Sequence, residues 1–436
     1  MPASRRGFYD HAVEPLLATF NRRTPLVLLS VLCTFALFAW YRSAHGPSAP
    51  LLHSDYGAYG RKRGFDGHWD YRRDAENLML DSQQCEQAFP DLFEEVERPV
   101  NQRMHNPITF EEIDAMPKQN GYVRAMIYNQ QVYTTDLYVI ATAGGIYSRE
   151  IATLHALHRA ILTSPEPLPN IEFAFNTDDR IPSVPLWGYA RRAEDTHIWL
   201  IPDFGYWSWP ETKVGSMREV QMKAALTEQV EGWGWGEKVA KLLWRGATMG
   251  LELRERLIQM TADKPWADVK ALNWHNTDSM TQDLKSMAEH CQYKYLAHTE
   301  GNSYSGRLKY LQACKSVVVA HKMDWIQHHH PLMRSSGPQQ NYLEVERSFE
   351  DLEQKISWLQ NHDKEAERIA ANSVRTFREQ YLTPAAEVCY WRKVIHGWAR
   401  VSFEPEFFKV VNGSSVWRGL PVESYLLERR LEWDPY

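Results

Sequence analysis

Cysteine is scarce in this chain, and no two cysteines are separated by just two residues. Only five occur in 436 residues. Without a Cys-x-x-Cys pair, a structural zinc site is not expected. The four that follow residue 50 permit no disulfide, one or two, with three pairings if all four join, and they suit a luminal protein body. These four are Cys85, Cys291, Cys314 and Cys389.

An excess of charge of one sign is also missing. The chain has 49 Lys and Arg against 55 Asp and Glu, and 44% of its residues are apolar. This balance argues against a disordered chain and against a nucleic acid as the partner. No internal repeat of about 20 to 50 residues is present, which excludes a solenoid. The length is enough for about two domains with sizeable cores.

Long apolar runs are limited to one, at residues 25–41, and it carries no charge. As a helix it would span roughly 26 Å, at the short end for crossing a membrane, which suits thin early-secretory membranes. Arginines before it favour a cytoplasmic N-terminus. We therefore expect a cytoplasmic tail (1–24), a transmembrane signal-anchor (25–41) and a stem (42–73), with a luminal body in the Golgi or ER. A cleaved signal peptide and a peripheral or buried helix are the alternatives.

Apolar periodicity predicts alternating strands and helices in the rest of the chain. This alternation favours an α/β fold of two halves, each with a parallel sheet, and ligands bind such sheets at the carboxyl ends of the strands. In the first half we expect helical structure over 74–100, a hairpin of 122–127 and 131–141, a helix over 148–162 and a strand over 171–175. In the second half we expect strands over 239–244, 293–298 and 317–320, and helices over 251–260, 305–313, 352–361, 364–381 and 385–401.

A small polar turn at 300–307 follows the predicted strand 293–298. It contains two glycines and two serines, so backbone amides can approach a ligand closely, and the predicted helix after it would offer its positive end. Arg307 adds a planar charged group suited to phosphate oxygens. The turn therefore indicates a nucleotide diphosphate site, although it could be only a helix entry. Its candidate residues are Asn302, Ser303, Ser305, Gly306 and Arg307.

Two other segments strengthen this interpretation. Residues 241–248, with Arg254 downstream, predict a second strand and turn that carry basic groups. Residues 170–179 predict a buried strand that ends in the paired carboxylates Asp178 and Asp179.

Together these segments resemble glycosyltransferase family 90, which contains the fungal capsule-associated proteins and the Rumi-like protein O-glucosyltransferases. The resemblance runs from about residue 74 to 405, and the stretches 382–386 and 389–392 are similar to filamentous-fungal members. Its most specific parts are Trp244-Arg245-Gly246, Tyr293-Lys294-Tyr295-Leu296, Glu300-Gly301, Ser305-Gly306-Arg307-Leu308 and the segment 341–352.

The resemblance implies a GT-B fold of two Rossmann-like lobes. It divides the chain into an N-terminal acceptor lobe (74–210), a C-terminal UDP-sugar lobe (211–405) and a C-terminal extension (406–436). It also implies transfer of glucose or xylose from a UDP-sugar to a carbohydrate or protein hydroxyl, with inversion and without a metal or other cofactor. No Asp-x-Asp follows a strand at a suitable place, as a metal-dependent transferase would require. A short anchor and stem match a type II Golgi enzyme.

The resemblance also implies residue roles. In relatives an aspartate follows Asn-x-x at the end of the strand, which makes Asp179 the catalytic base. Asp178 is the alternative base or a substrate contact, and both could be turn residues. Arg307 would bind the diphosphate with Ser305 and Gly306, and Arg254, or Arg256 nearby, would be a second donor-binding arginine. Ala247 stands where the glucosyltransferases have a serine. Thr248 could replace that hydroxyl, and Arg245 either binds the donor or orients the turn internally.

The roles of three aromatic residues and several histidines also need to be considered. Phe204, Tyr206 and Trp207 either stack on a sugar or pack in the core. His155 and His158 are expected to pack on their helix, and residues 328–330, three histidines, to form a solvated loop. The sole N-glycosylation acceptor is Asn412-Gly413-Ser414.

Two functions of other kinds remain open: a degenerate sugar-binding or quality-control protein on this scaffold and, less favoured, a hydrolase that uses Asp178 and Asp179. Adjacent side chains on an extended strand point to opposite faces, which argues against the hydrolase. The sequence does not choose the sugar. The fungal-like stretches favour a cell-wall or capsular polysaccharide as the acceptor over folded protein domains.

Overall fold

The computed structural model describes residues 64–138, 145–209, 212, 214–273 and 283–428. From Gly64 onward the chain forms one compact unit. The predicted membrane segment, the tail and most of the stem lie outside the described residues. Within the described residues, no helix is both long and apolar enough to span a bilayer.

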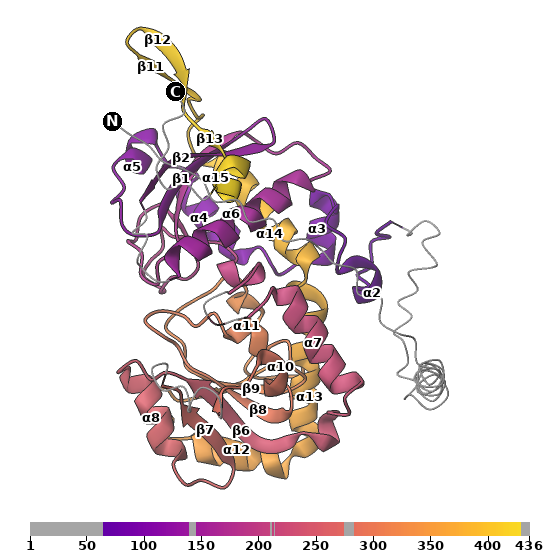
Figure 1. The fold of residues 1–436 in the computed structure, drawn as a ribbon. Helices are drawn as coiled ribbons and strands as arrows, with labels where there is room; N and C mark the ends of the chain where they lie inside the picture. Colours follow the sequence, from indigo (N-terminus) through magenta and orange to yellow (C-terminus); the bar gives the residue numbers. More distant parts are fainter. Residues whose placement is uncertain (1–63, 139–144, 210–211, 213, 274–282, 429–436) are drawn as a thin grey trace, which may run out of the picture. The chain divides into compact units, whose positions relative to one another are not determined.

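The first half is built on a six-stranded mixed sheet (Figure 1). The strand order is β13-β2-β1-β3-β4-β5. The predicted hairpin is confirmed, and the two residues of its turn, Asn129 and Gln130, have φ of 48° and 65°. Because β1 is antiparallel to both neighbours, only β3, β4 and β5 form the expected parallel arrangement. The strands are β1 Tyr122–Tyr128, β2 Gln131–Tyr138, β3 Ile171–Asn176, β4 Trp187–Gly188, β5 Trp199–Leu200 and β13 Leu420–Pro421.

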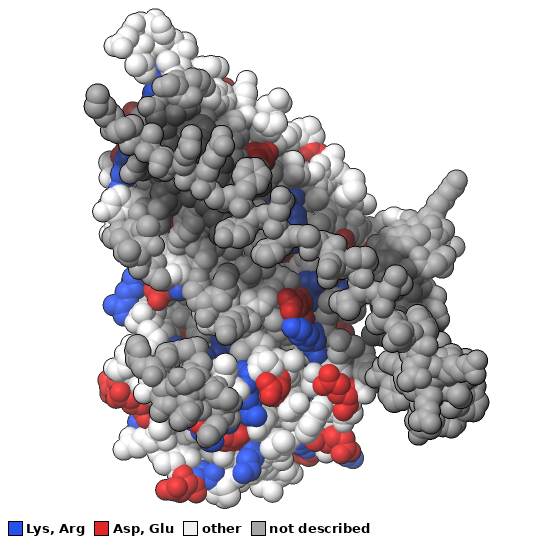
Figure 2. Space-filling model, in the orientation of Figure 1, with Lys and Arg blue, Asp and Glu red and all other residues white. Residues whose placement is uncertain are grey.

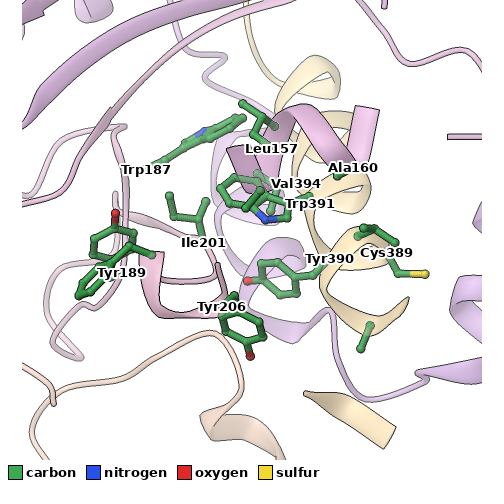
Figure 3. Packing of buried hydrophobic residues seen from close by; sticks show 14 of the residues in the cluster. Leu157, Ala160, Trp187, Tyr189, Ile201, Tyr206, Cys389, Tyr390, Trp391 and Val394 are labelled. Atoms are coloured by element: carbon green, nitrogen blue, oxygen red, sulfur yellow. The ribbon is translucent and has the colours of Figure 1, made fainter. Parts of the chain in front are cut away.

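Helices from both ends of the sequence cover this sheet. The long helix α14 Pro384–Arg400 packs against α3, α4 and α6, although the sequence-based division placed it in the second lobe. Figure 3 shows Tyr390, Trp391 and Val394 of α14 in one apolar cluster with Leu157 and Ala160 of α6. The other helices here are α2 Tyr71–Asp74, α3 Ser82–Ala88, α4 Glu94–Arg103, α5 Phe110–Asp114, α6 Ile146–Leu162, η1 Phe204–Tyr206 and α15 Val422–Glu428.

The second half is a five-stranded, fully parallel sheet in the order β10-β9-β8-β6-β7. Its strands are β6 Val239–Gly246, β7 Ala267–Ala271, β8 Tyr293–His298, β9 Val317–His321 and β10 Leu343–Val345. The helices are α7 Met217–Gln229, η3 Trp235–Glu237, α8 Glu252–Thr261, α10 Met287–His290, α11 Leu308–Leu311, η4 His330–Leu332, α12 Leu352–Asn361, α13 Asp363–Ser373 and the π-helix η5 Val374–Tyr381. A separate hairpin, β11 Phe408–Val411 and β12 Ser414–Trp417, follows α14.

Two disulfides are formed, which is one of the options left open by the sequence. Cys85 of α3 bonds Cys389 of α14 across 304 residues, so it holds α14 on the first half of the protein. Cys291 and Cys314 bond across 23 residues at the ends of the segment that contains β8 and α11.

The prediction of a solvated loop at residues 328–330 is wrong. His328 and His329 are 3% and 0% exposed. The ring of His328 contacts Tyr206 and Tyr390, and that of His329 contacts Phe377. Three consecutive polar residues suggested solvent, but aromatic rings from distant segments enclose them.

On the face shown in Figure 2, lysines and arginines are interspersed with aspartates and glutamates.

Candidate active site

The order of the parallel strands marks a binding position in the second half. After β6 the chain adds β7 on one side of it, and then adds β8, β9 and β10 on the other side. The direction of strand addition therefore reverses between β6 and β8. Ligands of open α/β sheets bind at the carboxyl ends of the strands at such a reversal. The segments that follow these two ends, 247–251 and 299–307, are the ones that the sequence selected.

Arg254 connects these two segments. Its Nε donates to the carbonyl of Glu300 at 3.0 Å, and its Nη1 donates to the carbonyl of Ala247 at 2.8 Å. Within the described part of the chain it has no carboxylate at ion-pair distance. Burial lowers its pKa, and the charge of Asp179 opposes that shift. A largely buried cation with no carboxylate in direct contact favours binding an anion.

Arg307 has fewer polar contacts than Arg254. Among the described residues its guanidinium makes no hydrogen bond or ion pair; it lies 5.9 Å from the centre of the Trp244 ring. Burial, and then the charge of Arg254, lowers its pKa to about 10, so it is charged at neutral pH. Two like charges that disfavour each other in a partly desolvated position are both stabilised by an anion placed between them.

Arg307 also borders a cavity of about 570 Å³. Volumes of this size accommodate small organic ligands. The wall combines residues of α7, α10 and the ends of β6 and β7 with Trp209 and Arg307. The polar side chains on it include Arg245, Glu219, Lys223, Lys285, Glu289 and His290.

Arg245 is engaged within the protein. Its Nη2 pairs with Asp268 at 2.6 Å, and its other donors reach the carbonyls of Trp244, Asp268 and Asp283. These contacts favour the interpretation in which it orients the strand end internally. Its contribution to donor binding stays a prediction.

The turn at 300–307 differs from its prediction in one respect. The helix after it is only Leu308–Leu311, with Arg307 at its N-cap, instead of 305–313. In this turn Gly301 lies close to the guanidinium of Arg254, since a Cβ on Gly301 would be 3.2 Å from its Nη2. A longer side chain there would displace Arg254.

The small polar residues near the two arginines are mostly free of side-chain partners. The hydroxyl of Ser303 is buried and has no hydrogen-bond partner in the part of the chain that is described. Ser305 and Thr248 are half-buried, and Gly306 lies against Trp209. Ala247 contributes its carbonyl to Arg254. The hydroxyl of Ser303 is therefore a buried polar group without a partner among the described residues.

Asp179 lies at the end of β3 and contacts this turn. Its Oδ1 pairs with Nη1 of Arg149 at 2.9 Å, and its Oδ2 accepts from Nδ2 of Asn302 at 3.3 Å. The carbonyl of Asn302 in turn accepts from Arg180 at 2.8 Å. The side chain of Asp179 remains 35% exposed, so solvent or a ligand can reach it.

Asp178 is directed into its own turn. Its Oδ1 accepts the backbone N–H of Asp179, and its own N–H donates to Asn176. This geometry fits the turn-residue interpretation for Asp178. It leaves Asp179 as the carboxylate that pairs with Arg149 and contacts the turn 300–307.

The aromatic segment is largely core. Phe204 and Tyr206 are 3% and 4% exposed, which leaves no ring face for a sugar and favours the packing alternative. The Tyr206 hydroxyl contacts His328. Trp207 is half-buried, and His155 stacks on it at 4.7 Å with Arg159 above the ring at 5.3 Å. His155 therefore packs as expected.

Two charged residues at this site were missed by the sequence analysis. Arg149 of α6 holds Asp179, and Lys309 forms a buried pair with Asp203 at 2.8 Å while donating to the carbonyl of Gly306. Lys309 thus connects the turn 300–307 with Asp203, the residue before η1. In the sequence Lys309 looks like an exposed helix residue, and no local signal identifies it. In the described ranges, no three potential metal-ligating carboxylate, histidine or cysteine side chains come together.

Comparisons with known proteins identify the family of this chain. The family model described as glycosyl transferase family 90 matches residues 82–409. Human protein O-glucosyltransferase 1 is 23% identical over 253 residues, covering 53% of this chain and 63% of that protein. The O-glucosyltransferase rumi of Drosophila melanogaster is 25% identical, covering 54% and 61%. The chain thus spans about three fifths of the length of these curated relatives. Since the family model covers most of the sequence, the chain belongs to glycosyl transferase family 90.

Proposed function

We propose that this protein transfers glucose or xylose from a UDP-sugar to a hydroxyl of a carbohydrate or protein, with inversion and without a metal. One observation carries the proposal. Beyond the carboxyl ends of β6 and β8, Arg254 and Arg307 have no carboxylate partner among the described residues, and the turn 300–307, which ends at Arg307, contacts Asp179 through Asn302.

The donor would be held by its diphosphate. Two guanidinium groups can each donate charge-assisted hydrogen bonds to phosphate oxygens, and the anion would relieve the unfavourable burial of both cations. The hydroxyls of Ser303 and Thr248 would add donors. The cavity beside Arg307 has room for the nucleoside.

Asp179 would act as the general base. As the acceptor oxygen attacks the anomeric carbon, its proton passes to the carboxylate of Asp179. The bond from that carbon to the phosphate oxygen breaks, and UDP leaves with the bonding electrons. Attack opposite the leaving group inverts the carbon. Arg149 and Asn302 would orient the carboxylate, which retains lone pairs for the proton.

Stabilisation of the leaving group would come from the two arginines. Negative charge develops on the diphosphate as UDP departs, and preorganised cations at that position lower the barrier. We include metal independence in the proposal because two guanidinium groups could neutralise the diphosphate, which is the role of a divalent ion in a metal-dependent enzyme.

The cellular setting is part of the proposal. We propose a GT-B arrangement in which the two sheets flank the site, and a type II anchor at residues 25–41 that places the body in the Golgi or ER lumen. The two disulfides support an oxidising compartment. Both curated relatives are named O-glucosyltransferases, which supports glucose, and the human relative is named a protein O-glucosyltransferase, which supports a protein acceptor. The fungal-like stretches support a cell-wall polysaccharide instead.

A donor screen tests the proposal. Residues 43–436 would be incubated with several UDP-sugars and candidate acceptors in excess chelator, and released UDP would be measured. We expect turnover of UDP-glucose or UDP-xylose that survives chelation. Activity that depends strictly on added manganese would reject the metal-free mechanism.

A degenerate sugar-binding protein is the second candidate. Both oxygens of Asp179 are engaged, and Ala247 stands where the family resemblance implies a serine, which favours this candidate. Such a protein would bind UDP-sugars without releasing UDP, neither by transfer nor by hydrolysis. The same screen therefore separates the two functions when a binding measurement is made in parallel.

A further inference from the structure

The hairpin β11–β12 carries the sole N-glycosylation acceptor of the sequence at its turn. Asn412 and Gly413 are the two turn residues, with φ of 50° and 80°, between the paired residues Val411 and Ser414. Two positive φ values are typical of a type I′ hairpin turn. Both turn residues are exposed. The amide of Asn412 is thus at a tip where a bulky group would meet no protein surface.

The strands beside this tip are unusually apolar for their exposure. Phe408, Val410 and Val411 are 52%, 78% and 41% exposed. Phe408 and Val410 lie on one face, and Phe408 contacts Trp417 across the hairpin. In a two-stranded sheet both strands are edges, and exposed apolar edge strands pair readily with other chains. This hairpin therefore requires something that covers it or keeps other strands away.

We propose that Asn412 carries an N-linked oligosaccharide and that this glycan shields the apolar strands of the hairpin. The two disulfides indicate an oxidising compartment, where the acceptor triad meets the glycosylation machinery. The donor is a lipid-diphosphate-linked oligosaccharide. The amide nitrogen of Asn412 loses a proton and bonds the anomeric carbon of the reducing-end sugar, and the lipid diphosphate leaves with the bonding electrons.

The position of the glycan matches the surface that needs cover. Phe408 is four residues from Asn412 along β11, so their Cα atoms are about 13 Å apart. A branched oligosaccharide is bulky and hydrated, so it would keep other edge strands from approaching this ribbon. None of these residues is part of the proposed transferase site, so the glycan and the enzymatic activity can be tested separately.

The first experiment measures occupancy. The full chain would be produced in a eukaryotic secretory host, and the peptide that contains Asn412 would be weighed before and after treatment with peptide N-glycosidase. We expect a glycan on the unaltered protein and on the control Ser415→Ala, which keeps the acceptor triad. Asn412→Gln and Ser414→Ala should both lack it. An unmodified Asn412 in the unaltered protein would overturn the proposal.

The second experiment measures shielding by light scattering at increasing protein concentration. Ser414→Ala removes the glycan but keeps Asn412 in its positive-φ position, and we expect it to self-associate. Adding Val410→Thr should suppress that association. Adding Val230→Thr, at a valine that is 51% exposed on another element, should not. A monodisperse Ser414→Ala protein, or equal effects of both valine changes, would contradict the shielding role.

Discussion

Arg254 and Arg307 show how a protein can prepare a cationic site without a bound anion. Arg254 is positioned by two carbonyl groups from different loops, and Arg307 by packing over Trp244. Neither has a carboxylate at ion-pair distance in the described part of the chain, and the charge of Arg254 contributes to the lowered pKa of Arg307. Such a pair is costly in the free protein, and the free energy is recovered when an anion binds.

Replacing Arg307 with alanine should weaken UDP binding by about 10- to 100-fold, since a charge-assisted hydrogen bond contributes about 1.5–3 kcal/mol. Calorimetric titration with UDP in chelator measures this. The control is Arg256→Ala: Arg256 bonds Gln259 and the carbonyl of Ser348 instead. Equal losses in the two variants would mean that Arg307 has no special role.

Replacing Asp179 with asparagine should lower kcat by about 100- to 10,000-fold, the usual contribution of a general base. The UDP affinity should change little, because asparagine keeps the size of the side chain. Asp178→Asn is the matched control, since Asp178 only caps its own turn, and it should keep most activity. If Asp178→Asn were the inactive variant, the base would be misassigned by one residue.

At this scale the sequence could indicate Asp179, Arg254 and Arg307, because each follows a recognisable strand and turn. It could not indicate Arg149, which lies 30 positions before Asp179 and reaches it only after α6 packs against β2 and η1. It also could not decide whether Phe204 and Tyr206 are exposed, since aromatic residues suit a sugar surface and a core equally well.

Among the elements, the connection between η1 and the turn 301–307 matters most for the site. Lys309 and Asp203 are each 1% exposed in their side chains, and they pair at 2.8 Å. Burial lowers the pKa of Lys309, and the charge of Asp203 opposes the shift. Since Lys309 also holds the carbonyl of Gly306, this pair fixes the turn beside Arg307.

Removing one member of that pair should be costly. Lys309→Met leaves the carboxylate of Asp203 buried and unpaired, so we expect a loss of about 3–5 kcal/mol in the free energy of unfolding. The double variant Asp203→Asn with Lys309→Met should recover much of it. Urea unfolding measures both, with Lys223→Met, in an exposed pair with Glu219, as a control that loses about 1 kcal/mol or less. Additive effects of the two buried changes would contradict the account.

The buried histidines predict a pH dependence of stability. Burial lowers the pKa of His328 to about 3 and of His330 to about 4. Unfolded histidine binds a proton near pH 6.5 and the folded form does not, so stability is full above that pH and falls as the pH decreases. Well below pH 6.5, each histidine should remove about 1.4 kcal/mol per pH unit.

Urea unfolding at pH 7.5, 6.0 and 5.0 checks this expectation. His328→Phe should make the free energy of unfolding less dependent on pH in the acid range, because one titrating group is removed. His362→Gln, at an exposed histidine, should leave the dependence unchanged. The same slope in all three proteins would show that the buried histidines do not control acid stability.

Elements with a clear apolar pattern were predictable. β8 and β9 are runs of buried residues, and β6 is buried from Leu242 onward. All three lie at the positions expected, because a run of apolar residues is typical of a buried parallel strand. The helix after the turn was predicted too long, since Leu308–Leu311 is stopped where the chain turns toward β9. The loop at 328–330 was misjudged because only tertiary contacts bury it.

In the whole molecule, segments near the end of the described chain pack on the first half. α14 packs on α3, α4 and α6, and β13 pairs with β2, so the last described segments complete the first sheet and its cover (Figure 1). The Cys85–Cys389 disulfide fixes this return. Pairings across about 300 residues leave no local pattern, so a division of the sequence by position could not show that α14 packs on the first half.

A crystal structure of the protein with UDP, grown in chelator, tests the central claim most directly. We predict that diphosphate oxygens lie within hydrogen-bond distance of the guanidinium groups of Arg254 and Arg307, with the carboxylate of Asp179 facing the same space. A nucleotide bound away from the carboxyl ends of β6 and β8, or no bound nucleotide at saturating UDP, would contradict the account.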